Sequence, residues 1–101
     1  MNTKIILLLS LCTLLSANEV DGKKVFETYC WGCHHQTAVA FGPPFNEIAE
    51  KRSAAQIQAY IISPKSMYKS FGYKRSAMTQ LELNNQEIQS ITEYILSYKG
   101  K

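Results

Sequence analysis

Apolar side chains recur at the three- and four-residue spacing of an amphipathic helix in three parts of the chain. These parts are residues 22–29, residues 54–62 and residues 85–98. A shorter helical turn is expected over residues 45–51. Together these elements predict an all-α fold.

Each of the three longer helices is preceded by a residue that favours a helix start. Asp21, Ser53 and Asn84 can each accept a hydrogen bond from a first-turn N–H group. Glu87 follows Asn84 by three residues, which predicts a capping box. Pro64 lies two residues beyond the second helix and ends it.

Two segments between the helices lack a sustained periodicity. Residues 35–45 contain Gly42-Pro43-Pro44, a run with restricted backbone angles that predicts a rigid loop. Residues 63–83 form a longer irregular stretch with several aromatic and basic side chains. Irregular stretches of this length are usually functional in a small domain, so we expect a function for this one.

The first seventeen residues have the pattern of a secretory signal peptide. Lys4 precedes an apolar stretch of about eleven residues, which is shorter than the ~20 residues of a membrane-spanning helix. We expect cleavage after Ala17 and an exported domain over residues 18–101. This predicts a periplasmic protein with no permanent membrane anchor.

The composition indicates one small globular domain. The chain has 101 residues, of which 46% are apolar and 19% charged, and its formal charge of +3 is too small to favour nucleic-acid binding. A domain of this size has little core and often gains stability from disulfides, a metal or a cofactor. Outside the predicted signal peptide, the cysteines are Cys30 and Cys33.

These two cysteines belong to Cys30-Trp31-Gly32-Cys33-His34, which has the spacing C-x-x-C-H. Two thiols at this spacing can form thioether bonds to the vinyl groups of one haem, and the histidine that follows can ligate its iron. The motif therefore predicts one covalently attached haem c, held by Cys30 and Cys33, with His34 as a ligand of the iron.

Three other uses of the motif are less well supported. A structural zinc site needs four ligands, and the histidines and cysteines of residues 18–101 all lie within residues 30–35 rather than in separated pairs. A thioredoxin-like redox pair would follow a β-strand, and no strand pattern precedes Cys30. A lone disulfide would close a very short loop and would give His34 no role.

With this motif in its context, the chain resembles a class I cytochrome c of the short bacterial monohaem kind. The shared features are the first helix with Gly22 and Phe26, the CWGCH motif, the Gly-Pro loop, a methionine-bearing loop and the last helix. The resemblance implies helices and loops wrapped around one haem. It also implies that the first and last helices cross, with Gly22 and Phe26 against Ile91, Tyr94 and Ile95.

The resemblance also implies the second ligand of the iron. Such cytochromes use a methionine before the last helix, and Met78 fits this position better than Met67. Thr79 stands where the family usually has proline after that methionine. By the same resemblance the carbonyl of Pro43 accepts a hydrogen bond from His34, whereas His35 is expected at the surface or the pocket edge.

We expect a large apolar cofactor to complete the core. The side chains expected around it are Phe26, Tyr29, Phe45, Ile57, Ile61, Tyr68, Phe71, Tyr73 and Ile91. The basic residues Lys65, Lys69, Lys74 and Arg75 are expected to dock acidic redox partners. The alternative for these four residues is a solvated basic loop without a partner.

These observations predict a monomeric one-electron carrier without enzymatic activity. Its expected partners are a quinol-cytochrome c reductase, a terminal oxidase, a peroxidase or another periplasmic oxidoreductase. One alternative is a five-coordinate haem protein that binds a small gas or peroxide, which the polar Ser76 and Thr79 beside Met78 would permit. The other is a dedicated electron-transfer subunit of one periplasmic enzyme.

Overall fold

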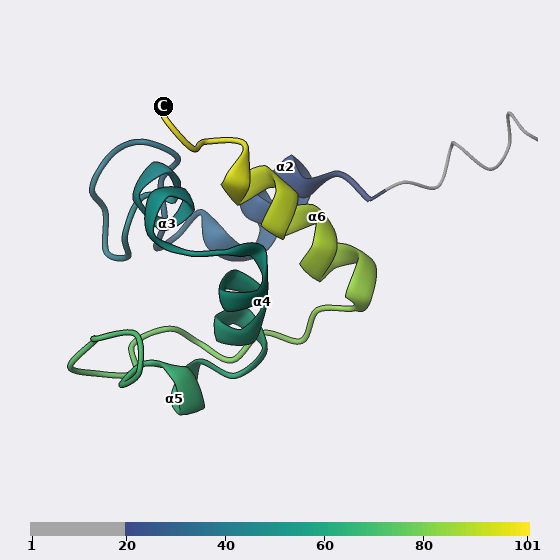
Figure 1. Ribbon diagram of the computed structural model, residues 1–101. Coiled ribbons are helices and arrows are strands. Elements are labelled where there is room, and N and C mark those ends of the chain that lie inside the picture. The colour runs from purple at the N-terminus through teal and green to yellow at the C-terminus, as the bar shows by residue number, and fades with distance from the viewer. Residues whose placement is uncertain (1–19) are drawn as a thin grey trace, which may run out of the picture.

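A computed structural model describes residues 20–101, and the predicted signal peptide lies outside these residues. The described part consists of helices joined by loops and contains no strand (Figure 1). Its elements in chain order are α2 (Gly22–Val25), the π-helix η2 (Phe26–Cys30), α3 (Phe45–Lys51), α4 (Ala54–Ile62), α5 (Pro64–Met67) and α6 (Asn85–Leu96). The all-α prediction is confirmed.

The predicted N-caps are present. Asp21 accepts a hydrogen bond from the Lys23 N–H at 3.0 Å. Ser53 and Asn84 both form complete capping boxes, in which the cap side chain and the side chain three residues later bond reciprocally to the backbone. Local sequence therefore determines where these helices begin.

The first helix differs from the regular helix that the periodicity predicts for residues 22–29. Beyond Val25 it widens into the π-helix η2, in which the Trp31 N–H donates to the Phe26 carbonyl at 3.0 Å. Single π-turns within helices are frequent at functional sites. Here the widened turn leads directly into the two cysteines.

Helix α6 is the centre of the packing and contacts α2, α3 and α4 (Figure 1). The hydrophobic core of the described residues contains Val25, Phe26, Phe45, Ala49, Ile57, Ile61, Ile91 and Ile95. The Phe26 ring lies 5.2 Å from Phe45 and 5.7 Å from Tyr94, between centroids. This confirms that the first helix packs on the last one.

The crossing of α2 and α6 depends on Gly22. A Cβ atom there would overlap the backbone carbonyl of Ser90 and lie 2.9 Å from the Cβ of Tyr94. The absence of a side chain thus lets the two helix backbones approach closely.

The segment predicted to be irregular, residues 63–83, contains the short helix α5. Pro64 is the first residue of α5, where its missing N–H costs no hydrogen bond. The same proline therefore follows one helix and begins the next, which the prediction had missed. No helix within residues 20–101 has both the length and the apolar character needed to cross a membrane.

Candidate functional site

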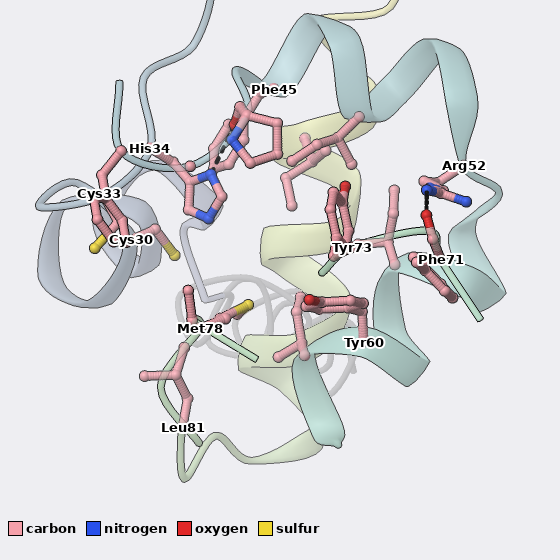
Figure 2. A pocket seen from close by; sticks show the side chains of 18 of the residues that line it. Cys30, Cys33, His34, Phe45, Arg52, Tyr60, Phe71, Tyr73, Met78 and Leu81 are labelled. Carbon is pink, nitrogen blue, oxygen red and sulfur yellow. Dashed lines mark hydrogen bonds between the residues drawn. The ribbon is translucent and has the colours of Figure 1, made fainter. Parts of the chain in front are cut away.

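A cavity of about 310 Å³ lies among α3, α4, α6, the loops on either side of α3 and the loop after α5 (Figure 2). Its wall is mainly apolar and includes Phe45, Ile57, Ile61, Ile91 and Ile95. Cys30, Cys33, His34 and Met78 also line it. The cavity therefore brings together the four residues that the sequence singled out for haem chemistry.

A tight turn after η2 places the two cysteines and the histidine on one side of the cavity. The N–H groups of Cys33 and His34 both donate to the Cys30 carbonyl, at 3.1 and 2.9 Å. The two thiols are free, so the disulfide alternative has no support in the structure. Burial, with a smaller contribution from Cys33, raises the pKa of the Cys30 thiol to about 11. A redox-active cysteine needs a lowered pKa, which argues against a thioredoxin-like pair.

The ring of His34 is held on two sides. Its Nδ1–H donates to the Pro43 carbonyl at 2.8 Å, and the Phe45 ring lies 5.6 Å away between centroids. Gly42 lies directly against the imidazole, since a Cβ there would be 2.6 Å from the His34 Cε1. This arrangement leaves Nε2 free to ligate a metal and directs it into the cavity (Figure 2).

Met78 lies across the cavity from His34, and its thioether points into the same space (Figure 2). The side chain is half-buried and packs against the core. Met67, in α5, does not line the cavity. Of the two methionines within residues 20–101, the structure therefore brings only Met78 to His34.

The end of the cavity away from the cysteines is polar. The Arg52 guanidinium lies 4.2 Å from the centre of the Phe71 ring and donates through Nη2 to the Phe71 carbonyl at 2.9 Å. The Tyr60 ring lies 5.0 Å from Phe71 and 5.8 Å from Tyr73. Burial, with a further contribution from Tyr73, raises the pKa of Tyr60, and Arg52 opposes this shift. Tyr60 therefore remains a hydroxyl donor at neutral pH.

Sequence reasoning missed Arg52 and Tyr60 as site residues. Arg52 directly precedes the N-cap Ser53, a position that carries no functional signal of its own. Tyr60 belongs to the apolar face of α4, where its spacing indicates only core packing. Both residues line the cavity because α3 and α4 meet at Arg52.

Several side chains expected around the cofactor lie elsewhere. Phe71 and Tyr73 line the cavity, but Tyr68 does not. Tyr68 is the C-cap of α5, its ring faces the Lys69 ammonium at 5.9 Å, and its carbonyl accepts from the Tyr73 N–H. The turn at α5 thus carries Tyr68 away from the wall that Phe71 and Tyr73 form.

Three other residues that the sequence placed in or near the cofactor pocket lie outside the cavity. Phe26 is buried in the core but does not reach the cavity, and Tyr29 is 44% exposed. His35 is exposed, and its Nδ1 accepts hydrogen bonds from the N–H groups of Thr37 and Ala38 at 3.1 and 3.0 Å. His35 is thus occupied in a local turn outside the cavity.

The residues of the cavity fit a haem. Two thiols stand beside the imidazole that would ligate the iron, and a thioether faces that imidazole from across the cavity. The apolar wall suits the macrocycle, and the hydrogen-bond donors of Arg52, Tyr60 and Tyr73 at the far end suit its carboxylates. Within residues 20–101, no cluster of three or more histidine, cysteine or acidic side chains could hold a metal ion, so a zinc site is not supported.

A small all-α fold built around this cavity defines a protein that binds haem covalently. The family model for cytochrome c matches residues 19–99, and the chain belongs to this family. It is a c-type cytochrome whose cofactor is covalently attached haem c, and it is a haem-binding electron carrier. Proteins of this family generally transfer electrons and are not enzymes. Comparisons with curated proteins and with solved structures gave no match.

Proposed function

We propose that this cytochrome is a periplasmic monohaem carrier in which Cys30 and Cys33 form the thioethers and His34 and Met78 are the axial ligands. The observation that carries this proposal is the placement of the His34 imidazole and the Met78 thioether on opposite sides of the cavity that the two thiols border. The haem supplies one-electron chemistry by cycling between its ferric and ferrous states.

The protein side chains keep the surroundings of the iron constant during this change. The Pro43 carbonyl fixes the tautomer and orientation of His34 and makes its Nε2 a stronger donor. The apolar wall limits the access of water to the cavity. If His34 and Met78 both hold the bound haem, little would have to move when its charge changes, which would favour fast electron transfer.

The test is the absorption spectrum of the haem-loaded protein and of its Met78→Ala and Met67→Ala variants. We expect a low-spin ferric wild type with a sulfur-to-iron charge-transfer band and no carbon monoxide shift in the ferrous form. Met78→Ala should lose the band and bind carbon monoxide readily, because one axial position becomes open. Met67→Ala is the control and should keep both wild-type properties, since Met67 lies outside the cavity.

Three results would contradict the proposal in different ways. A high-spin wild type that binds carbon monoxide would favour the five-coordinate haem protein. Loss of the band in Met67→Ala instead of Met78→Ala would show that Met67, and not Met78, is the ligand of the iron. A stable oxidoreductase that co-purifies with the chain would favour the dedicated subunit over a free carrier.

For partner docking we propose a smaller basic surface than the sequence predicted. Lys74 and Arg75 line the cavity together with Phe41, which is 78% exposed. Lys65 and Lys69 are exposed but do not line it. Neither Lys74 nor Arg75 forms an ion pair with any residue from 20 to 101, so both charges are available to an acidic redox partner.

Charge-removing substitutions can distinguish the contribution of Lys74 and Arg75 to docking from that of Lys65 and Lys69. Lys74→Gln with Arg75→Gln should slow electron transfer to an acidic partner, such as a terminal oxidase, about fivefold at low salt. The difference should vanish as ionic strength rises, because salt screens exposed charges. Lys65→Gln with Lys69→Gln removes the same charge and should have a smaller effect. Equal effects of the two pairs would show that total charge, and not this surface, steers the encounter.

A further inference from the structure

The segment that carries Met78, residues 74–83, is almost free of hydrogen bonds. Its residues form no regular element, and none of their backbone groups bonds to another backbone group within residues 20–101. The Tyr73 N–H and the Asn84 carbonyl, on either side of the segment, are both engaged. Ten consecutive residues around the proposed ligand are therefore held without a backbone ladder.

One side chain connects this segment to the rest of the fold. The Gln80 Nε2 donates to the Ile62 carbonyl at 2.7 Å, and it also approaches the Leu81 carbonyl at 3.4 Å. No other hydrogen bond or ion pair joins residues 74–83 to another part of the described chain. Gln80 lies two residues beyond Met78, so the bond fixes the backbone close to the ligand.

The acceptor is well suited to this role. Ile62 is the last residue of α4, and the carbonyls at a helix end lack intrahelical partners. The N–H four positions on, that of Ser66, donates instead to the Ser63 carbonyl at 3.1 Å. The Gln80 amide thus satisfies a carbonyl that the helix itself leaves open.

The remaining contacts of the segment are apolar. Met78 and Leu83 pack against the core, and Leu81 lines the cavity. Apolar contacts are not directional, so they bury these side chains without fixing the position of the backbone between them. Thr79, directly after Met78, does not restrict its own φ angle as a proline would. The hydrogen bond of Gln80 is therefore the one directional interaction that fixes the position of this backbone relative to the other described residues.

We propose that Gln80 is a positioning residue for Met78, which it holds toward the cavity by tying residues 74–83 to the end of α4. The inference rests on the proposed function, in which Met78 is an axial ligand. Gln80 is exposed and does not line the cavity, so it acts through the backbone and not by contact with the haem. Its loss should let Met78 leave the iron more often while the fold persists.

The experiment uses the haem-loaded protein with three substitutions of Gln80. Gln80→Ala removes the hydrogen bond. Gln80→Glu keeps the length of the side chain but replaces the donor with an acceptor that repels the Ile62 carbonyl. Gln80→Lys restores a donor of similar reach, which is favourable at a helix C-terminus.

Two properties report on Met78 directly: the sulfur-to-iron charge-transfer band of the ferric protein and the rate of carbon monoxide binding to the ferrous protein. We expect Gln80→Ala to bind carbon monoxide about fivefold faster than wild type and to have a weaker band, because one hydrogen bond is lost. Gln80→Glu should show at least as large a change. Gln80→Lys should return both properties toward wild type, a rescue that a general loss of stability would not produce.

Two control variants change exposed side chains that form no hydrogen bond to the segment. Glu82→Gln lies within the segment, and Gln86→Ala repeats the amide-to-alanine change in α6. Both should behave as wild type. If Gln80→Ala also behaves as wild type while Met78→Ala loses the band, the positioning role of Gln80 is wrong and the ligation stands. If Met78→Ala keeps the band, the proposed ligation fails and the inference falls with it.

Discussion

A chain in which serines replace Cys30 and Cys33, purified free of haem, should be largely unfolded under conditions in which the haem-loaded protein is folded. The substitutions remove the groups proposed to attach the cofactor and leave the helix-forming residues unchanged. The reason for unfolding is the position of the cavity, which lies between α4, α6 and the cysteine turn. Without the cofactor, these elements lose the contacts that it would supply and do not pack against one another across the cavity.

The size of the cavity gives the expected magnitude. At about 24 cal/mol per Å³, an enclosed cavity of about 310 Å³ would cost about 7 kcal/mol. Small domains have a total stability of about 5–15 kcal/mol, and the buried core of residues 20–101 is small. The cavity is partly open, so water reduces the cost, but the loss remains comparable with the whole stability.

Circular dichroism and urea unfolding of the two proteins provide the measurement. The haem-loaded protein should show a strong helical signal and a cooperative urea transition. The haem-free double variant should show neither. A haem-free chain with the helical signal and the cooperative transition of the loaded protein would mean that α6 packs stably without the cofactor.

Substitution of Gly22 by alanine should destabilise the haem-loaded protein by about 2–3 kcal/mol. Helix propensity alone predicts the opposite, since alanine is favoured over glycine in a helix by about 1 kcal/mol. The difference comes from the crossing of α2 and α6, where a Cβ would overlap the Ser90 carbonyl and crowd the Cβ of Tyr94. The Ser90 carbonyl is part of the backbone, and the Cβ of Tyr94 is bonded directly to it. Neither atom can move aside without a shift of α6.

Gly32→Ala is the matched control. Gly32 has no heavy atom within 4 Å of its would-be Cβ, and its φ angle is not positive. The free energy of unfolding of both variants, from urea titration, should separate them, with Gly32→Ala close to wild type. Equal stability of Gly22→Ala and wild type would show that the helices can separate at this point without cost.

Much of this protein follows from local sequence. The capping residues Asp21, Ser53 and Asn84 form the predicted bonds because a cap involves only groups within one turn of helix. The CWGCH motif indicates its cofactor for a similar reason, since attachment and ligation use five consecutive residues. The family match over residues 19–99 agrees with this cofactor.

Other features depend on which segments meet. The periodicity of residues 22–29 predicts a helix but does not reveal that its last turn is a π-helix. Pro64 predicts the end of α4 equally well whether or not another helix begins there. Tyr68 and Tyr73 have the same chemistry in the same segment, and only the turn at α5 decides that Tyr73 lines the cavity and Tyr68 does not.

The sequence by itself determined the helical class, the starts of the helices and the covalent haem, because each is encoded in residues close together along the chain. Only the tertiary structure decided that Arg52 and Tyr60 complete the cavity, and that Gln80 bonds to the end of α4. These contacts join segments whose approach depends on how α3, α4 and α6 pack. No local pattern encodes such an approach, because it results from the burial of all the apolar faces together.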